Sequence, residues 1–115
     1  MAREALERRL RWSGVIARTW QAHTTRAKAP AYAEHLQNSV FTELDQLEGY
    51  TGGMLLQREV DDGVEVVVIT FWQSLESIRV FAGGDLESAV VHEKAAALLN
   101  DFDRRVKHYE VVLKA

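Results

Sequence analysis

The segment VEVVVITFWQSLESIRVFAG, residues Val64–Gly83, contains an apolar strand that leads directly into a helix. In its first nine residues, Val64–Trp72, only Glu65 is charged, and apolar side chains fall on both faces of an extended chain. A strand that is apolar on both faces is normally covered on both faces. Ser74 then has the character of a helix N-cap, and the helix is predicted to run to about Phe81.

The rest of the chain supplies three more strands and two more helices. Strands are predicted over residues 15–23, 50–60 and 106–113, and helices over residues 29–47 and 86–99. Asp62-Gly63 predicts a two-residue hairpin, and Gly52-Gly53 predicts a bulge. The order β-α-β-β-α-β indicates the α+β class and a ferredoxin-like fold. This fold is a four-stranded antiparallel sheet with the helices packed on one face.

Composition limits the function classes. The chain has 115 residues with 47% hydrophobic and 27% charged residues, as expected of one globular domain, which we place at residues 14–115 after an N-terminal extension of residues 1–13. The net charge of −3 disfavours a nucleic-acid partner, and the absence of cysteine excludes disulfides and thiolate metal sites. The sequence shows no signal peptide or membrane span, so a cytoplasmic location is the default expectation.

The second apolar face of the predicted sheet has a consequence for assembly. Two helices cover only one face of a four-stranded sheet, and the other would be a large exposed apolar patch, which monomers rarely carry. We therefore expect a homodimer that packs sheet against sheet about a two-fold axis. Closure of the two copies would enclose an apolar cavity with a few polar groups, as in many small-molecule pockets.

Three segments carry a resemblance to a known family. Residues Val64–Gly83 resemble the third strand and following helix of the antibiotic biosynthesis monooxygenase superfamily. VIARTWQAH, residues 15–23, and HYEVV, residues 108–112, are similar to the first and last strands of small bacterial members. The resemblance covers about residues 14–113 and implies a dimeric α+β barrel, in which the last strand often reaches toward the partner.

The resemblance also implies roles for single residues. It implies that Trp72 borders the substrate cavity, as in cofactor-free oxygenases, although a core or interface aromatic would follow the same pattern. It places His92 where haem-degrading relatives have their iron ligand, whereas an ordinary helix-surface histidine is the alternative. The asparagine and second tryptophan of those enzymes fall near Arg18 or Thr19 and near Phe81 here, so the haem-degrading pattern is incomplete.

The remaining candidates come from the strand patterns. If Arg18 points into the barrel it is a buried cation, which needs either an anionic substrate or a salt bridge with an acid such as Glu65 or Glu110. We expect the substrate to contact three apolar residues, namely Trp20, Phe81 and Val68. No HExxH motif or close histidine pair is present, so no protein-only metal site is expected, and His92 would bind iron only within a haem.

These observations favour one function and leave two alternatives open. The first is a cofactor-independent monooxygenase for a small aromatic or polyketide-like substrate, with Arg18, His92 and Trp72 as its catalytic residues. In that scheme Arg18 stabilises an anion, His92 relays a proton and Trp72 stacks on the ring. The alternatives are a non-catalytic dimeric protein that binds a small ligand, and a haem-binding or haem-degrading oxygenase.

Overall fold

A computed structural model describes residues 3–4 and 12–115, and its fold is α+β. Most of the predicted extension, residues 1–13, therefore lies outside the described residues. The strands are β1 (Ile16–Thr24), β2 (Tyr50–Val60), β3 (Gly63–Trp72), β4 (Asp101–Phe102) and β5 (Lys107–Glu110). The helical segments are α2 (Ala29–His35), η1 (Leu36–Val40), α3 (Phe41–Leu44), α4 (Leu75–Ala82) and α5 (Glu93–Ala96).

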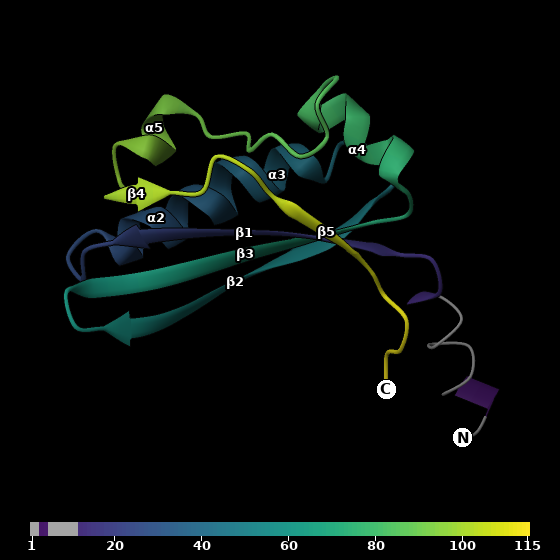
Figure 1. Ribbon diagram of the computed structural model, residues 1–115, viewed down its shortest axis with the longest axis horizontal. Helices are drawn as coiled ribbons and strands as arrows, with labels where there is room; N and C mark the ends of the chain where they lie inside the picture. The colour runs from purple at the N-terminus through teal and green to yellow at the C-terminus, as the bar shows by residue number, and fades with distance from the viewer. Residues whose placement is uncertain (1–2, 5–11) are drawn as a thin grey trace.

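The sheet is antiparallel, with the order β2-β3-β1, and both β4 and β5 pair with the free edge of β1 (Figure 1). The predicted ferredoxin-like sheet is thus confirmed, with its last strand divided in two. A bulge is present one residue before the predicted Gly52-Gly53, because the β2–β3 register shifts between Tyr50 and Gly52 while both glycines pair regularly with β3. The β2–β3 turn is Asp61-Asp62 rather than Asp62-Gly63, because Gly63 already pairs with Val60.

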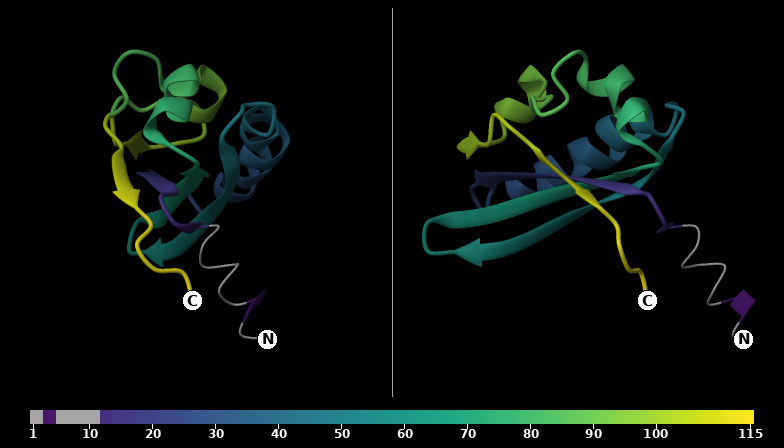
Figure 2. Two further views of the ribbon diagram at one scale, coloured as in Figure 1. Left: turned by 90° about the vertical axis from the view of Figure 1, so that its right-hand side faces the viewer. Right: turned by 45° about the vertical axis from the view of Figure 1, so that its right-hand side comes forward.

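The helical segments α2 to α5, with η1 among them, all lie on one face of the sheet, as the end-on view in Figure 2 shows. Alternate residues of β1 and β3 point into this helix side and form the core with α2 and α4, among them Ala22, Val66 and the fully buried Trp72. The opposite face, which we call the outer face, carries Met54 and Leu56 of β2 and the odd-numbered residues of β3.

The first helical segment begins at Ala29, with Pro30 in the first turn, where its missing N–H costs nothing. It continues without a break through the π-helical turn η1 and ends at Leu44, three residues before the predicted end. The hydroxyl of Thr42 donates to the carbonyl of Gln37 at 3.0 Å, five residues back along this widened turn. Isolated π turns of this kind occur often at functional sites.

The helix predicted over residues 86–99 was mostly wrong. Only Glu93–Ala96 is helical, and the preceding segment 86–92 is irregular. Its backbone hydrogen bonds go elsewhere: Ala89 N–H donates to the carbonyl of Arg104, and the carbonyl of Glu87 accepts from Val106 N–H. The same pairing interrupts the last strand. The strand predicted over residues 106–113 is therefore limited to β5, with β4 as a separate short piece.

Candidate functional site

A cavity of about 310 Å³ lies between the sheet and the helices of a single chain. Its walls come from β1, β3, the first helical segment, α4 and the irregular segment before α5. This placement differs from the expected enclosure between two copies, because one chain alone forms the walls. The size is at the lower end of the range for small-molecule pockets, and most lining residues are apolar.

Two of the predicted catalytic residues and all three predicted substrate-binding residues meet in this cavity. The lining includes Arg18, Trp20, Val68, Phe81 and His92. Trp20 is fixed by a hydrogen bond of 2.7 Å from its indole N–H to the carbonyl of Asp103. Phe81 presents its ring to the Arg18 guanidinium, whose central carbon lies 5.6 Å from the ring centroid, a cation–π arrangement.

Trp72, the remaining predicted residue, does not line the cavity. Its exposed fraction is 0%, and it packs in the core with Leu44 and Ile78. One face stacks on Phe81, at 5.9 Å between ring centroids, and its indole Nε1–H donates to Thr70 Oγ1 at 2.9 Å. A molecule in the cavity would therefore meet Phe81 and Thr70, with Trp72 directly behind them.

Arg18 is the best-buried charged residue that faces the cavity, with an exposed fraction of 5%. Its Nη1 donates to the carbonyl of Leu86 at 2.6 Å and to His108 Nε2 at 2.9 Å, and its Nη2 donates to the carbonyl of Ser88 at 2.8 Å. These bonds tie the irregular segment to β1. Burial lowers the pKa of Arg18 to about 10, which leaves the guanidinium charged at neutral pH.

No carboxylate neutralises this cation among the described residues. Glu65, one of the two acids proposed as its partner, instead pairs with Arg58 at 2.6 Å, and the other, Glu110, is exposed opposite Ile16. A buried charge without a counterion is costly, so its partners here are carbonyl dipoles, one imidazole and whatever enters the cavity.

His108 holds Arg18 from the neighbouring strand β5, where the two residues form a cross-strand pair. An arginine can only donate, so His108 Nε2 accepts and the imidazole is neutral with its proton on Nδ1. Burial, followed by the charge of Arg18, lowers the pKa of His108 and favours this neutral form, while Glu87 acts weakly in the opposite direction.

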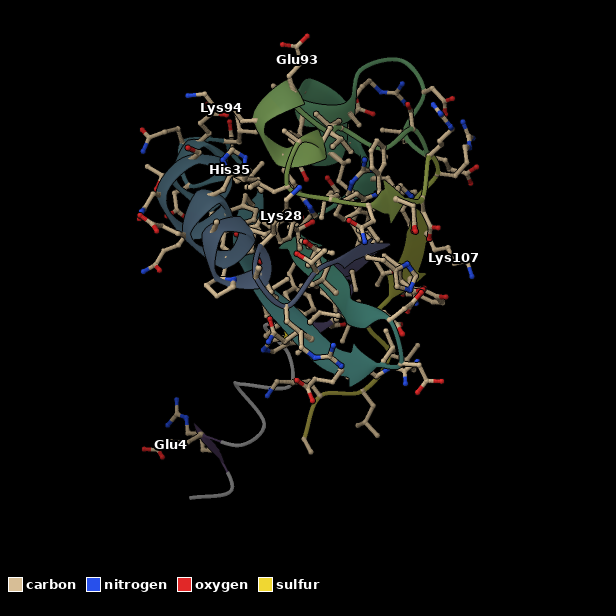
Figure 3. All side chains as sticks on the ribbon, turned by 90° about the vertical axis from the view of Figure 1, so that its left-hand side faces the viewer. Glu4, Lys28, His35, Glu93, Lys94 and Lys107 are labelled. Carbon is tan, nitrogen blue, oxygen red and sulfur yellow. The ribbon has the colours of Figure 1, made fainter. Side chains whose placement is uncertain are left out.

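His92 occupies the rim of the cavity. It is the N-cap residue of α5, its backbone is extended and its side chain is exposed. This position is not the mid-helix position that the sequence predicted. Figure 3 shows that Glu93, the next residue, points away from the molecule.

Three further polar residues line the cavity and were missed by the sequence analysis: Thr70, Tyr32 and Glu43. Thr70 is buried on β3, Tyr32 is buried on α2, and Glu43 is exposed on α3. Burial raises the pKa of Tyr32 well above its ordinary value, so its phenol stays protonated. Thr70 and Tyr32 lie in apolar periodic patterns and Glu43 lies outside the apolar stripe of its helix, so only the assembled sheet and helix reveal that the three share a cavity.

Within the described residues, no cluster of three or more histidine, aspartate or glutamate side chains is arranged to hold a metal ion. Over the same residues, no helix has the length and apolar character needed to cross a membrane.

We compared the chain with known protein families, curated proteins and solved structures. No protein-family model matches the sequence, and no curated protein matches it either. Solved structures do match. A Bacillus cereus protein assigned to the antibiotic biosynthesis monooxygenases superposes with a TM-score of 0.61 and 19% identity, over 90% of this chain and 98% of that one.

Two other similar solved structures are of proteins described by their activity. A variant of SnoaB, a cofactor-independent oxygenase from Streptomyces nogalater, superposes with a TM-score of 0.60 and 18% identity, over 89% of this chain and 97% of that one. MhuD, a haem-degrader from Mycobacterium tuberculosis with two haems in its active site, superposes with a TM-score of 0.55 and 21% identity. The match covers 87% of this chain and 98% of that one. The chain therefore has the ferredoxin-like α+β fold of the antibiotic biosynthesis monooxygenases.

Proposed function

We propose that the protein is a cofactor-independent monooxygenase that oxidises a small aromatic or polyketide-like substrate in the cavity. The observation that carries the proposal is a buried arginine, without a carboxylate partner among the described residues, in the wall of a mostly apolar pocket. Such a pocket favours an aromatic molecule that becomes an anion when it loses a proton. The fold, shared with the cofactor-independent oxygenase SnoaB, supports the same reading.

The proposed reaction balances without an external reductant. An anthrone-type substrate loses a proton, and its carbanion, delocalised as an enolate, gives electrons to O₂. One oxygen atom then enters the substrate as a carbonyl oxygen, and the other leaves as water with two hydrogens of the substrate's methylene group. The protein would stabilise the anion, hold the ring and keep bulk water out of the pocket.

The residues have distinct parts in this scheme. Arg18 stabilises the anionic oxygen, and Phe81, Val68 and Trp20 hold the ring system. His92, exposed at the rim, exchanges the proton with solvent. Phe81 takes the ring-contacting part that the sequence assigned to Trp72, because Trp72 lies behind it.

Oxygen uptake with the anthrone dithranol tests the proposal. The wild-type protein should consume O₂ faster than buffer alone, and Arg18→Met should lower the catalysed rate by about a hundredfold, as loss of one transition-state donor does in other enzymes. Arg104→Met is the matched control, since Arg104 is exposed and makes no side-chain contact in the cavity. Uptake no faster than the buffer background with dithranol and related anthrones would count against an oxygenase.

Haem binding is the second candidate, because His92 lines the cavity and MhuD has the same fold. Titration with haem should then shift the Soret band, and His92→Ala should remove the shift. An unchanged spectrum in that variant would reject His92 as the ligand. If a small molecule co-purifies with the protein but no oxygen is consumed, the non-catalytic binding function is the better description.

We also propose that the protein acts as a homodimer. The outer face exposes Met54 and Leu56, with exposed fractions of 43% and 47%, and the register places Val67 and Ile69 beside them. Among the described residues, Trp12 packs on Phe71 of this face, and none of the helical segments α2 to α5 covers it. An apolar sheet face left open in this way is typical of a subunit interface.

A further inference from the structure

The strand register places Thr70 next to Arg18 in the wall of the cavity. It lies directly opposite Arg18 in the antiparallel pair β1–β3, so both side chains project from the same face of the sheet. Directly opposed residues have their Cβ atoms only about 5 Å apart. Thr70 has an exposed fraction of 6%, and both residues line the cavity.

The hydroxyl of Thr70 has one hydrogen that no protein group uses. Trp72 Nε1–H donates to Thr70 Oγ1 at 2.9 Å, and an indole N–H can only donate, so the oxygen is the acceptor in this bond. The hydroxyl hydrogen must point elsewhere, and no acceptor for it is found among the described residues. A buried donor that stays unpaired costs free energy, which makes it a natural partner for a ligand oxygen.

Arg18 retains donors as well. Its three hydrogen bonds use both Nη1 hydrogens and one Nη2 hydrogen, directed to Leu86, His108 and Ser88. The Nε–H and the second Nη2–H have no acceptor within the described part of the chain. Those bonds also fix the guanidinium, so it does not need to reorganise when a ligand arrives.

We propose that Thr70 and Arg18 together form a two-donor site for the ionised oxygen of an aromatic ligand, a phenolate or an enolate, and that Trp72 is the positioning residue that directs the Thr70 hydroxyl toward it. This inference rests on the proposed function, since it specifies which oxygen the cavity recognises. Hydrogen bonds to an ionised oxygen are about twice as strong as those between neutral groups, so the pair favours the deprotonated ligand.

The surroundings match this ligand class. Beyond the two donors, the lining near β3 and α4 is apolar, with Val68 and Phe81 available to a ring system. The one carboxylate in the lining, Glu43, is exposed on α3, where water screens its charge. Trp72 contributes without contacting the ligand, because it is fully buried behind Thr70.

Binding of 2-naphthol across a range of pH tests the proposal, because the phenol and the naphtholate have different absorption spectra. The wild-type protein should bind the naphtholate more tightly and lower the pKa of the bound naphthol. Thr70→Val, nearly the same shape without the hydroxyl, should weaken naphtholate binding by about tenfold to a hundredfold. The pKa of the bound naphthol should rise by about one to two, as expected for that loss.

Thr70→Ser is the matched control, because it keeps the hydroxyl and should retain most of the naphtholate affinity. Trp72→Phe removes the donor that orients the hydroxyl and should give an intermediate affinity, provided that thermal unfolding shows a folded protein. If Thr70→Val binds naphtholate like the wild type, or if the wild type does not favour naphtholate, the two-donor site is wrong.

Parallel measurements keep the two proposals distinct. If 2-naphthoate binds more tightly than 2-naphthol and with the same dependence on Thr70, the site recognises carboxylates and the proposed ligand class is overturned. Thr70-dependent naphtholate binding without oxygen uptake from dithranol would leave the two-donor site intact and reject the oxygenase alone. Oxygen uptake that Thr70→Val does not change would reject the two-donor site and leave the oxygenase proposal intact.

Discussion

Arg18 shows how one residue in a strand can set the chemistry of a pocket. Its place on the helix side of β1 follows from the alternation of the strand, and its burial leaves a charge that only carbonyls and an imidazole contact among the described residues. Carbonyl dipoles solvate a guanidinium but do not neutralise it. The cavity therefore has a positive potential at one end, which attracts an anionic ligand.

The Arg18–His108 hydrogen bond predicts a pH dependence of stability. The folded state lowers the pKa of His108 below the ordinary 6.5, so the unfolded chain binds a proton more readily. This contribution to stability is fully present above pH 6.5 and is lost as the pH falls from there through the lower folded pKa. Urea unfolding at neutral pH and at about pH 5 should show the loss in the wild type and a smaller loss in His108→Gln.

A comparison of the two proteins isolates His108 from the other histidines. The hydrogen bond to Asp101 raises the pKa of His23, so its contribution is present at low pH and lost as the pH rises. That opposite slope is the same in wild type and variant and cancels in their difference. Equal pH slopes in the two proteins would show that His108 is not held neutral by the fold.

The sequence could identify Arg18 but not its neighbours. Alternation in VIARTWQAH places Arg18 with Trp20 on one face, and this was enough to raise the question of a buried cation. Nothing in the strand patterns distinguishes Thr70 or His108, and their proximity to Arg18 follows from the registers of two separate strand pairs. A register across non-consecutive strands depends on tertiary packing, which a single sequence does not encode locally.

At the scale of elements, local sequence patterns predicted correctly the segments whose backbone hydrogen bonds stay within a helix or join neighbouring strands of a hairpin. Ser74 caps α4 as predicted, through reciprocal hydrogen bonds with Ser77, and β2 has the predicted bounds. The segment 86–92 failed because tertiary partners compete for its backbone: Arg18 binds the carbonyls of Leu86 and Ser88, and a bridge to Arg105 holds Ser88. A helix over residues 86–92 could form only if these contacts were broken.

Two glycines with positive φ, Gly49 in the turn before β2 and Gly83 at the end of α4, predict a contrast in stability. Gly49 and Gly83 both have positive φ, +90° and +80°, so alanine at either position should cost about 1 kcal/mol of unfolding free energy. A Cβ on Gly49 would also lie 2.4 Å from the Cβ of Ser77, whereas one on Gly83 would meet nothing within 4 Å. Gly49→Ala should therefore be the more destabilising by at least about 1 kcal/mol, as overpacking is.

Urea denaturation of the two alanine variants measures this difference, with Gly83→Ala as the control for backbone strain alone. Equal losses would mean that α4 moves away from Gly49 at little cost. That result would also weaken the view that Gly49 fixes the close approach of α4 to the turn before β2, which helps to place Phe81 over the cavity.

At the scale of the whole molecule, the sheet has two unlike faces. The helix side contains the core and the cavity, and the segments α2 to α5 all lie on it (Figure 2). The outer face carries apolar side chains beside the Arg58–Glu65 ion pair, with Trp12 packed on Phe71. Past β5, the C-terminal segment exposes Val112 and Leu113, with exposed fractions of 89% and 80%. The two-sided apolar character of β3 was evident from the sequence, but which face holds the cavity was not.

The proposed homodimer makes a prediction that separates the two faces. Leu56 of the outer face and Leu75 of α4 are almost equally exposed, at 47% and 45%. If two copies meet through the outer face, Leu56→Lys places a charge in the interface and should dissociate the dimer, because a buried unpaired lysine is costly. Leu75→Lys, on the helix side, should leave the dimer intact. Sedimentation velocity at micromolar concentration measures the oligomeric state of both variants. A wild-type monomer would reject the homodimer, and dissociation by Leu75→Lys alone would place the interface on the helix side. Because the cavity is built by one chain, a monomeric Leu56→Lys variant that still binds 2-naphthol would show that assembly and ligand recognition are separable properties of the two faces.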